Sequence, residues 1–192
     1  MLVLASQSPR RRELLTQAGY HFTVQPADIP EDPLPNENPV AYVTRLARQK
    51  AQAVYDQLAD PSATVLGADT TVTVDDEILG KPADSQDAAR MLRLLSGRSH
   101  RVITGVALVT AHSCEVAAEV TAVRFLTLSD EEIASYISTD EPLDKAGAYA
   151  IQGRAARWIP RIVGCYFNVV GLPLALVSTL LDSTSTHPAS LP

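Results

Sequence analysis

Residues 2–19 read LVLASQSPRRRELLTQAG, and this stretch decides the expected fold. Its first four residues are apolar, which is long enough for a buried strand. Ser8 is suited to cap a helix whose first position is Pro9, where the missing N–H costs nothing. We expect the helix to end before Gly19, since glycine suits the position after a last turn. A strand, a short loop and a helix are the opening of an α/β fold.

Three arginines, Arg10, Arg11 and Arg12, fall in the first turn of this helix. Cations there oppose the positive end of the helix dipole, so the arrangement is unfavourable unless an anion binds. A helix N-terminus behind a Ser-rich loop is a phosphate-binding arrangement, and arginine adds paired donors for phosphate oxygens. Successive helical residues point about 100° apart, so all three cannot face one ligand, and solvated arginines are the alternative. We favour the anion site.

The composition is that of a soluble globular protein and narrows the functional classes. The 192 residues are 46% hydrophobic and 20% charged, which suits one domain over residues 1–182 and a disordered tail at 183–192. The net charge of −6 argues against a general nucleic-acid surface, and no apolar run is long enough to span a membrane. Cys114 and Cys165 lie in no metal or redox spacing, which favours a reducing compartment, and no signal peptide is visible.

The rest of the chain alternates predicted helices and strands. Apolar periodicity and capping residues predict further helices from 39 to about 59, from 84 or 85 to 96, from 129 to about 138 and from 172 to about 181. Short apolar or alternating runs predict strands at 22–25, 64–68, 72–74, 99–110 and 115–128. Residues 158–170 are β-rich in composition, and we expect extended structure there.

Three charged residues stand in unusual places. Lys50 falls inside the apolar stripe of the helix expected over 39–59, where a snorkelling side chain is the simpler interpretation and an interior anion the alternative. Asp69 interrupts a β stretch, where a buried carboxylate is costly unless it is paired or metal-bound, and capping a local turn is the alternative. Glu31 belongs to an acidic loop with five prolines, which is either a linker or a means of delivering a carboxylate to a site. For Asp69 we favour a functional role, and for any one acid of the loop we favour the linker.

Several motifs are specific together, although each alone is weak. They read LASQSPRR (4–11), ARQKA (47–51), GADTTV (67–72), GKP (80–82), LSGRSHRVITGV (95–106), DEPLDKAGAYAIQG (140–153) and VVGLPL (169–174). In these motifs the chain resembles the Maf family of nucleotide pyrophosphatases, and in detail the branch that acts on dTTP and UTP. The resemblance covers the chain from its start to about residue 180.

The resemblance implies an α/β fold of the Maf/ITPase-like kind, with a long twisted mixed β-sheet and flanking helices around a cleft, and often a homodimer. The implied reaction is hydrolysis of a nucleoside triphosphate to the monophosphate and pyrophosphate with a divalent cation, Mg²⁺ or Mn²⁺. The family is loosely associated with septum formation, so the alternative is a nucleotide-binding regulator of cell division without turnover. A carboxylate beside bound phosphates favours the enzyme, since a pure binder would not need it.

The family pattern also implies roles for the catalytic and phosphate-binding residues. Asp69 is expected to act as the general base or to hold the metal that activates water, and Glu31 to share that metal. Hard oxygen ligands of this kind suit magnesium or manganese. Phosphoryl transfer needs charge neutralisation more than covalent chemistry, and the residues expected to hold the phosphates are Ser6, Ser8, Arg10, Lys50 and Lys81.

The family pattern implies that a second set of substrate-binding residues sets the base preference. These residues are Arg11, Thr70 and Gln152. Uracil and thymine present an acceptor O4 beside a donor N3–H, and the Gln152 amide can match this pair. An amide can flip to suit cytosine, so the donor-only Arg11 is needed for discrimination, and Thr70 could orient the amide or a bridging water. Arg12 departs from the polar residue often found there, and we expect it to be solvent-exposed.

Overall fold

The computed structural model describes residues 1–75 and 77–185. Its strands are β1 (Leu2–Ala5), β2 (Thr23–Val24), β3 (Thr64–Val74), β4 (Glu77–Leu79), β5 (Ser99–Val109), β6 (Cys114–Arg124) and β7 (Arg161–Val163). Its helices are α1 (Pro9–Gln17), α2 (Pro39–Leu58), α3 (Ser85–Leu95), α4 (Asp130–Ile137), α5 (Tyr166–Val170) and α6 (Leu174–Ser185). Two 3₁₀ turns, η1 (Ala146–Ala148) and η2 (Arg154–Trp158), lie between α4 and β7.

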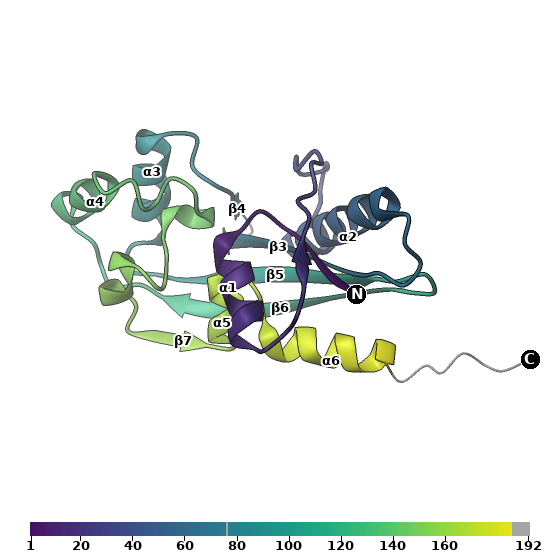
Figure 1. Ribbon diagram of the computed structural model, residues 1–192. Helices are drawn as coiled ribbons and strands as arrows, with labels where there is room; N and C mark the ends of the chain where they lie inside the picture. The colour runs from purple at the N-terminus through teal and green to yellow at the C-terminus, as the bar shows by residue number, and fades with distance from the viewer. Residues whose placement is uncertain (76, 186–192) are drawn as a thin grey trace, which may run out of the picture.

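The strands form one mixed sheet in the order β2-β1-β3-β5-β6-β7, with β4 pairing to β3 as well. β1 runs parallel to β2 and β3, whereas the pairs of β3 with β5 and of β5 with β6 are antiparallel. Side chains alternate between the two faces of a strand. One face of β3 packs against α2, and the other packs against α1 and α6 (Figure 1). The expected α/β class with a mixed sheet and flanking helices is confirmed.

Helix α2 lies against the sheet at two glycines. A Cβ atom on Gly67 of β3 would lie 2.2 Å from the carbonyl oxygen of Ala47, and one on Gly105 of β5 would lie 2.4 Å from that of Val43. Neither position has room for a side chain, so the backbone of α2 rests directly on the two strands. This close approach brings the side chain of Lys50 onto β3.

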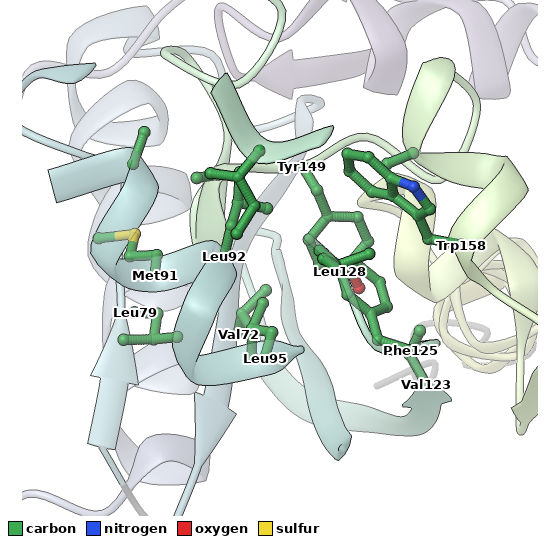
Figure 2. Close-up of a cluster of buried hydrophobic side chains, with 14 of the residues drawn as sticks. Val72, Leu79, Met91, Leu92, Leu95, Val123, Phe125, Leu128, Tyr149 and Trp158 are labelled. Atoms are coloured by element: carbon green, nitrogen blue, oxygen red, sulfur yellow. The ribbon is translucent and has the colours of Figure 1, made fainter. Parts of the chain in front are cut away.

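A large cluster of the core is rich in aromatic side chains, and it packs against the segment that follows α4. Figure 2 shows Phe125, Tyr149 and Trp158 gathered beside the leucines of α3. Phe125 and Tyr149 meet edge to face, with 4.8 Å between ring centroids. His100 Nε2 lies 2.8 Å from the Tyr149 hydroxyl, and burial lowers the pKa of His100 to about 4, so this histidine is neutral near pH 7. Tyr149 is thereby fixed at the start of the turn that carries Gln152.

The C-terminal third differs from the sequence prediction. The β-rich interpretation of residues 158–170 is wrong, because only the short strand β7 is extended and α5 is helical. The side-chain amide of Asn168 donates to the carbonyl of Val102 and to Thr121 Oγ1, and these contacts with β5 and β6 override the local β propensity.

The strand expected over 115–128 ends at Arg124. Helix α6 continues through residues 183–185, which we had placed in the tail, and residues 186–192 lie outside the described residues.

Replacing Gly67 by alanine should destabilise the fold. The new methyl group would overlap the Ala47 carbonyl, a backbone atom that can move only if α2 shifts as a whole. Overpacking of this kind costs about 1–3 kcal/mol or more. Urea denaturation followed by circular dichroism measures the loss.

The matched control is Gly80→Ala. An added Cβ at Gly80 would meet nothing within 4 Å, so this variant should unfold at nearly the wild-type urea concentration. Equal midpoints for the two variants would contradict the close approach of α2.

Candidate active site

The site lies where one edge of β3 has no strand partner. β1 pairs with β3 only as far as Gly67, and β4 pairs with it only from Val72 onward. Asp69 and Thr70 lie between these two limits, on a strand that is continuous from Thr64 to Val74. Asp69 therefore does not cap a turn, and the alternative that we had considered for it is wrong. The sheet is open at this edge, and both faces of β3 can be reached from it.

A cavity of about 570 Å³ opens at this edge. Its volume lies within the range of about 300–1,000 Å³ that is usual for small-molecule sites. Every residue that the sequence analysis placed at a site lines it: Ser6, Ser8, Arg10, Arg11, Glu31, Lys50, Asp69, Thr70, Lys81 and Gln152. Segments far apart in the sequence are thus brought together by the sheet.

A buried lysine joins two carboxylates in this cavity. Lys50 Nζ lies 2.7 Å from Asp69 Oδ1 and 2.7 Å from Glu31 Oε1. Lys50 and Asp69 are buried, whereas more than half of the Glu31 side chain is exposed. The snorkelling interpretation of Lys50 is therefore wrong, because the close packing of α2 points the ammonium at β3. The acidic loop delivers a carboxylate to the site, and the Tyr42 hydroxyl ties this loop to α2 by donating to the Glu31 carbonyl at 2.9 Å.

The charge state of Asp69 is set by opposing influences. Burial raises the pKa of Asp69 above its ordinary value, because a carboxylate is poorly solvated there. The positive charges of Lys50 and Arg11 act in the other direction and favour the ionised form. A carboxylate that is ionised but poorly solvated is a better proton acceptor than one in water, which is what a general base requires.

The loop after β1 supplies hydroxyl groups for an anion. Ser8 caps α1, and its Oγ accepts from the backbone N–H of Arg11 at 3.4 Å. Ser6 Oγ accepts from the Ser8 N–H and from Arg11 Nη1, each at 3.2 Å. Within the described part of the chain neither hydroxyl donates a hydrogen bond, so both protons are available for phosphate oxygens. Arg10 Nη1 lies 3.7 Å from Asp144 across the cavity.

Arg11 is held by the protein on three sides. Its Nε donates to the Gly171 carbonyl at 2.8 Å, Nη2 to Thr70 Oγ1 at 3.0 Å and Nη1 to Ser6. Burial lowers the pKa of Arg11 and the charge of Asp69 opposes that shift, but a guanidinium remains protonated in proteins. Two of its five N–H groups are left for a ligand. Arg12 is exposed, as expected.

A residue that the sequence analysis missed extends this network. Thr104 on β5 is fully buried directly across the ladder from Thr70, with 2.9 Å between the two hydroxyl oxygens. Thr104 Oγ1 also lies 3.1 Å from the Asn168 carbonyl oxygen and Thr70 Oγ1 lies 3.4 Å from that of Gly171, so either hydroxyl can be the donor in this pair. The Thr70 hydroxyl is thus occupied in holding Arg11. Thr104 lies within the motif at 95–106, but threonine is an ordinary strand residue, so its position alone did not predict a role at the site.

Gln152 and Lys81 border the cavity from two loops that touch. Gln152 is exposed on a turn closed by a hydrogen bond from the Gly153 N–H to the Ala150 carbonyl, at 3.1 Å. Lys81 is exposed just after β4, and the Gly80 carbonyl before it accepts from the Gly147 N–H at 3.1 Å. Both side chains can therefore reach a ligand without any rearrangement of the sheet.

The donor set suits a hard divalent cation that also contacts the substrate. In the ranges 1–75 and 77–185, no group of three or more His, Cys, Asp or Glu side chains is arranged to hold a metal ion. Glu31 and Asp69, however, bring two carboxylates to one point. Magnesium is commonly held by one or two carboxylates, with phosphate oxygens and water completing its shell.

The sequence is similar to that of known enzymes over most of its length. A family model described as Maf-like protein matches residues 1–184. A protein of Koribacter versatilis named dTTP/UTP pyrophosphatase is 53% identical over 180 residues, which are 94% of this chain and 92% of the relative. Another of the same name, from Symbiobacterium thermophilum, is 56% identical over 173 residues, 90% of this chain and 88% of the relative.

The fold has a solved counterpart. The structure of the Staphylococcus aureus Ham1 protein aligns with a TM-score of 0.54 over 95% of this chain and 98% of that chain, at 13% sequence identity, so the likeness concerns the fold alone. Across the described residues, no helix has the length and apolar composition that crossing a bilayer requires. Since the family match spans nearly the whole sequence, the chain belongs to the Maf family.

Proposed function

We propose that this chain hydrolyses dTTP and UTP to the nucleoside monophosphate and pyrophosphate. The observation that carries the proposal is the buried Lys50, bonded to Asp69 and Glu31 in a cavity that is also lined by Arg10, Arg11 and Lys81. In that arrangement Asp69 would serve as a carboxylate base beside the groups that would bind the phosphates. The similarity to proteins named dTTP/UTP pyrophosphatase supports the choice of substrate.

The phosphates would occupy the side of the cavity formed by α1 and the loops near it. Ser6 and Ser8 have hydroxyl protons to donate, and Arg10 can exchange its 3.7 Å contact with Asp144 for a phosphate oxygen. Lys81 would add a further cation. These contacts neutralise the charge of the triphosphate, which lowers the barrier for attack on a phosphorus atom.

Asp69 would take a proton from the attacking water. Its pKa is raised by burial, and Lys50 holds the carboxylate in place at 2.7 Å. Glu31 and Asp69 would also hold a magnesium or manganese ion, which when bound supplies charge neutralisation and lowers the pKa of a bound water. Glu31 is suited to share such an ion, because its partly exposed side chain can turn away from Lys50.

The base would be recognised by Arg11 and Gln152, which line the same cavity. The two remaining N–H groups of Arg11 would donate to the O4 acceptor of uracil or thymine, and the exposed Gln152 amide would match O4 and N3–H together. Thr70 and Thr104 would act by holding Arg11 in place. The 5-methyl group adds only apolar contact, so dTTP and UTP should be used about equally.

We also propose a cytoplasmic location and a homodimer. Cys114 and Cys165 are both free thiols, which suits a reducing compartment. The homodimer rests on the family resemblance, and light scattering in solution measures it.

Asp69→Asn should abolish turnover while nucleotide binding survives or tightens. The amide cannot accept the proton of water, and removal of a negative charge relieves repulsion with the phosphates. General bases contribute about 10²–10⁴-fold, so we expect kcat to fall by about 100-fold or more in a pyrophosphate-release assay. Calorimetric titration with UTP measures the binding.

The matched control for this change is Asp56→Asn, an exposed residue of α2 that should keep full activity. In the wild type, kcat/KM should also decline on acidification at a pH above the ordinary range for aspartate, because protonation of Asp69 starts earlier when its pKa is raised. Near-wild-type kcat for Asp69→Asn would exclude Asp69 as the base. Nucleotide binding without pyrophosphate release by the wild type would favour a regulator.

Removal of divalent metal should abolish activity without unfolding the chain. Of the two expected ligands, Asp69 lies on a strand that the core already holds, and Glu31 lies on an exposed loop. The fold therefore does not need the ion. Treatment with a chelator should leave the far-ultraviolet circular dichroism unchanged, and either magnesium or manganese should restore pyrophosphate release. A chelator that unfolds the protein would count against this assignment.

UTP and dTTP should exceed CTP and the purine triphosphates in kcat/KM. A base with the wrong edge leaves polar groups unpaired, at a cost on the order of 1–3 kcal/mol for each group. Gln152→Ala should lose most of the preference, whereas Gln86→Ala, an exposed glutamine of α3, should retain it. Equal kcat/KM for UTP and CTP in the wild type would refute the base specificity but leave the pyrophosphatase standing.

A further inference from the structure

The turn that carries Gln152 is held at both ends by two side chains of the α4 region. The backbone N–H of Ala150 donates to the Tyr136 hydroxyl at 3.2 Å. The backbone N–H of Arg154 donates to both carboxylate oxygens of Glu141, at 3.2 and 3.3 Å. Gln152 lies midway between these two anchored positions.

The two anchors are joined to each other. The Tyr136 hydroxyl donates to Glu141 Oε1 at 2.7 Å, so one hydroxyl group both accepts from the turn and donates to the carboxylate. The arrangement is directional, because an ionised carboxylate can only accept and the backbone N–H groups can only donate. Tyr136, Glu141 and the turn thus form a closed set of hydrogen bonds, which we call the clamp.

Glycine at position 153 is required by the clamp. A Cβ atom there would lie 1.9 Å from Glu141 Oε1 and 2.4 Å from its Cδ, so the carboxylate rests directly on the Gly153 backbone. The φ angle of Gly153 is −101°, which other residues adopt freely. The need for glycine therefore comes from the close approach of Glu141 and not from backbone conformation.

The clamp is itself fixed by the aromatic core. Tyr136 is buried, and its ring meets Trp158 edge to face with 5.1 Å between centroids. Trp158 Nε1 donates to Glu132 on α4 at 3.1 Å. Lys145 Nζ donates to the Glu141 carbonyl at 2.8 Å, which fixes the backbone of the carboxylate as well.

We propose that Tyr136 and Glu141 are positioning residues that set base selectivity by fixing the turn of Gln152. This inference rests on the proposed function, in which Gln152 reads the base. Neither residue is among the described residues that line the cavity, so neither acts on the base by direct contact. A glutamine on a fixed turn presents its amide in one place, and a wrong base then leaves it unpaired, whereas a loose turn lets the amide adapt.

The test compares kcat/KM for UTP and for CTP in Tyr136→Phe and Glu141→Gln. The phenylalanine keeps the packing against Trp158 and removes only the bridging hydroxyl, and the glutamine keeps the size of Glu141 but replaces an acceptor by a donor. We expect the UTP-to-CTP ratio to fall about fivefold or more in each variant, since each loses hydrogen bonds to the turn. Tyr55→Phe and Glu77→Gln, neither of which is among the residues that line the cavity, should keep the wild-type ratio.

A double-variant cycle separates positioning from general destabilisation. In a Gln152→Ala background, Tyr136→Phe should change the ratio no further, because the group being positioned is gone. Amide hydrogen exchange without nucleotide gives a readout that does not depend on activity, and Ala150 and Arg154 should exchange faster in Tyr136→Phe. If Glu141→Gln does not fold, Tyr136→Phe decides alone.

Two further outcomes are distinguishable. In the first, the wild type prefers UTP and both variants keep its UTP-to-CTP ratio of kcat/KM within about twofold. This result would refute the positioning role of Tyr136 and Glu141 and leave the proposed function intact. A wild type with no preference for UTP would refute the base specificity, and the inference with it.

Discussion

The ion pair between Lys50 and Asp69 is the interaction on which the rest of the site depends. Removing two charges from water costs several kcal/mol for each ion, and a pair offsets this cost only if its geometry is good. The geometry here comes from Gly67 and Gly105, which let the backbone of α2 rest on the sheet and set the ammonium 2.7 Å from the carboxylate. Glu31 brings a second carboxylate to the same ammonium from an exposed loop.

How much the sequence could predict depends on whether the deciding contact is local. The cap formed by Ser8 and Pro9 is local, and the structure has it as expected. The cost of an aspartate in a β stretch singled out Asp69, which the structure shows to be buried and paired with Lys50. The direction of Lys50 was missed, because the spacing of a helix does not reveal how close its partner sheet will come. The β-rich composition of residues 158–170 did not predict α5, because Asn168 is held by contacts with strands that are distant in the sequence.

The residues that hold the substrate-facing side chains in place were the hardest to predict from the sequence. Thr104, Tyr136 and Glu141 do not line the cavity: Thr104 contacts Thr70, and the other two hold the turn around Gln152. Thr104 and Glu141 fall within quoted motifs, but a place in a motif does not reveal what a side chain holds. They are ordinary residues for a strand, a helix and a loop. The resemblance to a family supplied the residues that would meet the substrate, whereas only coordinates show what keeps them in place.

The gap between β1 and β4 has a consequence for the length of β3. Neighbouring residues of a strand face opposite ways, so Asp69 turns toward α2 and Thr70 toward Arg11. The charges that would act on phosphates and the groups that would read the base are thus separated by one peptide unit. Loss or gain of a single residue between Gly67 and Asp69 would turn the side chains of Asp69 and Thr70 to the opposite faces of the strand. Insertions should therefore be excluded from these few positions.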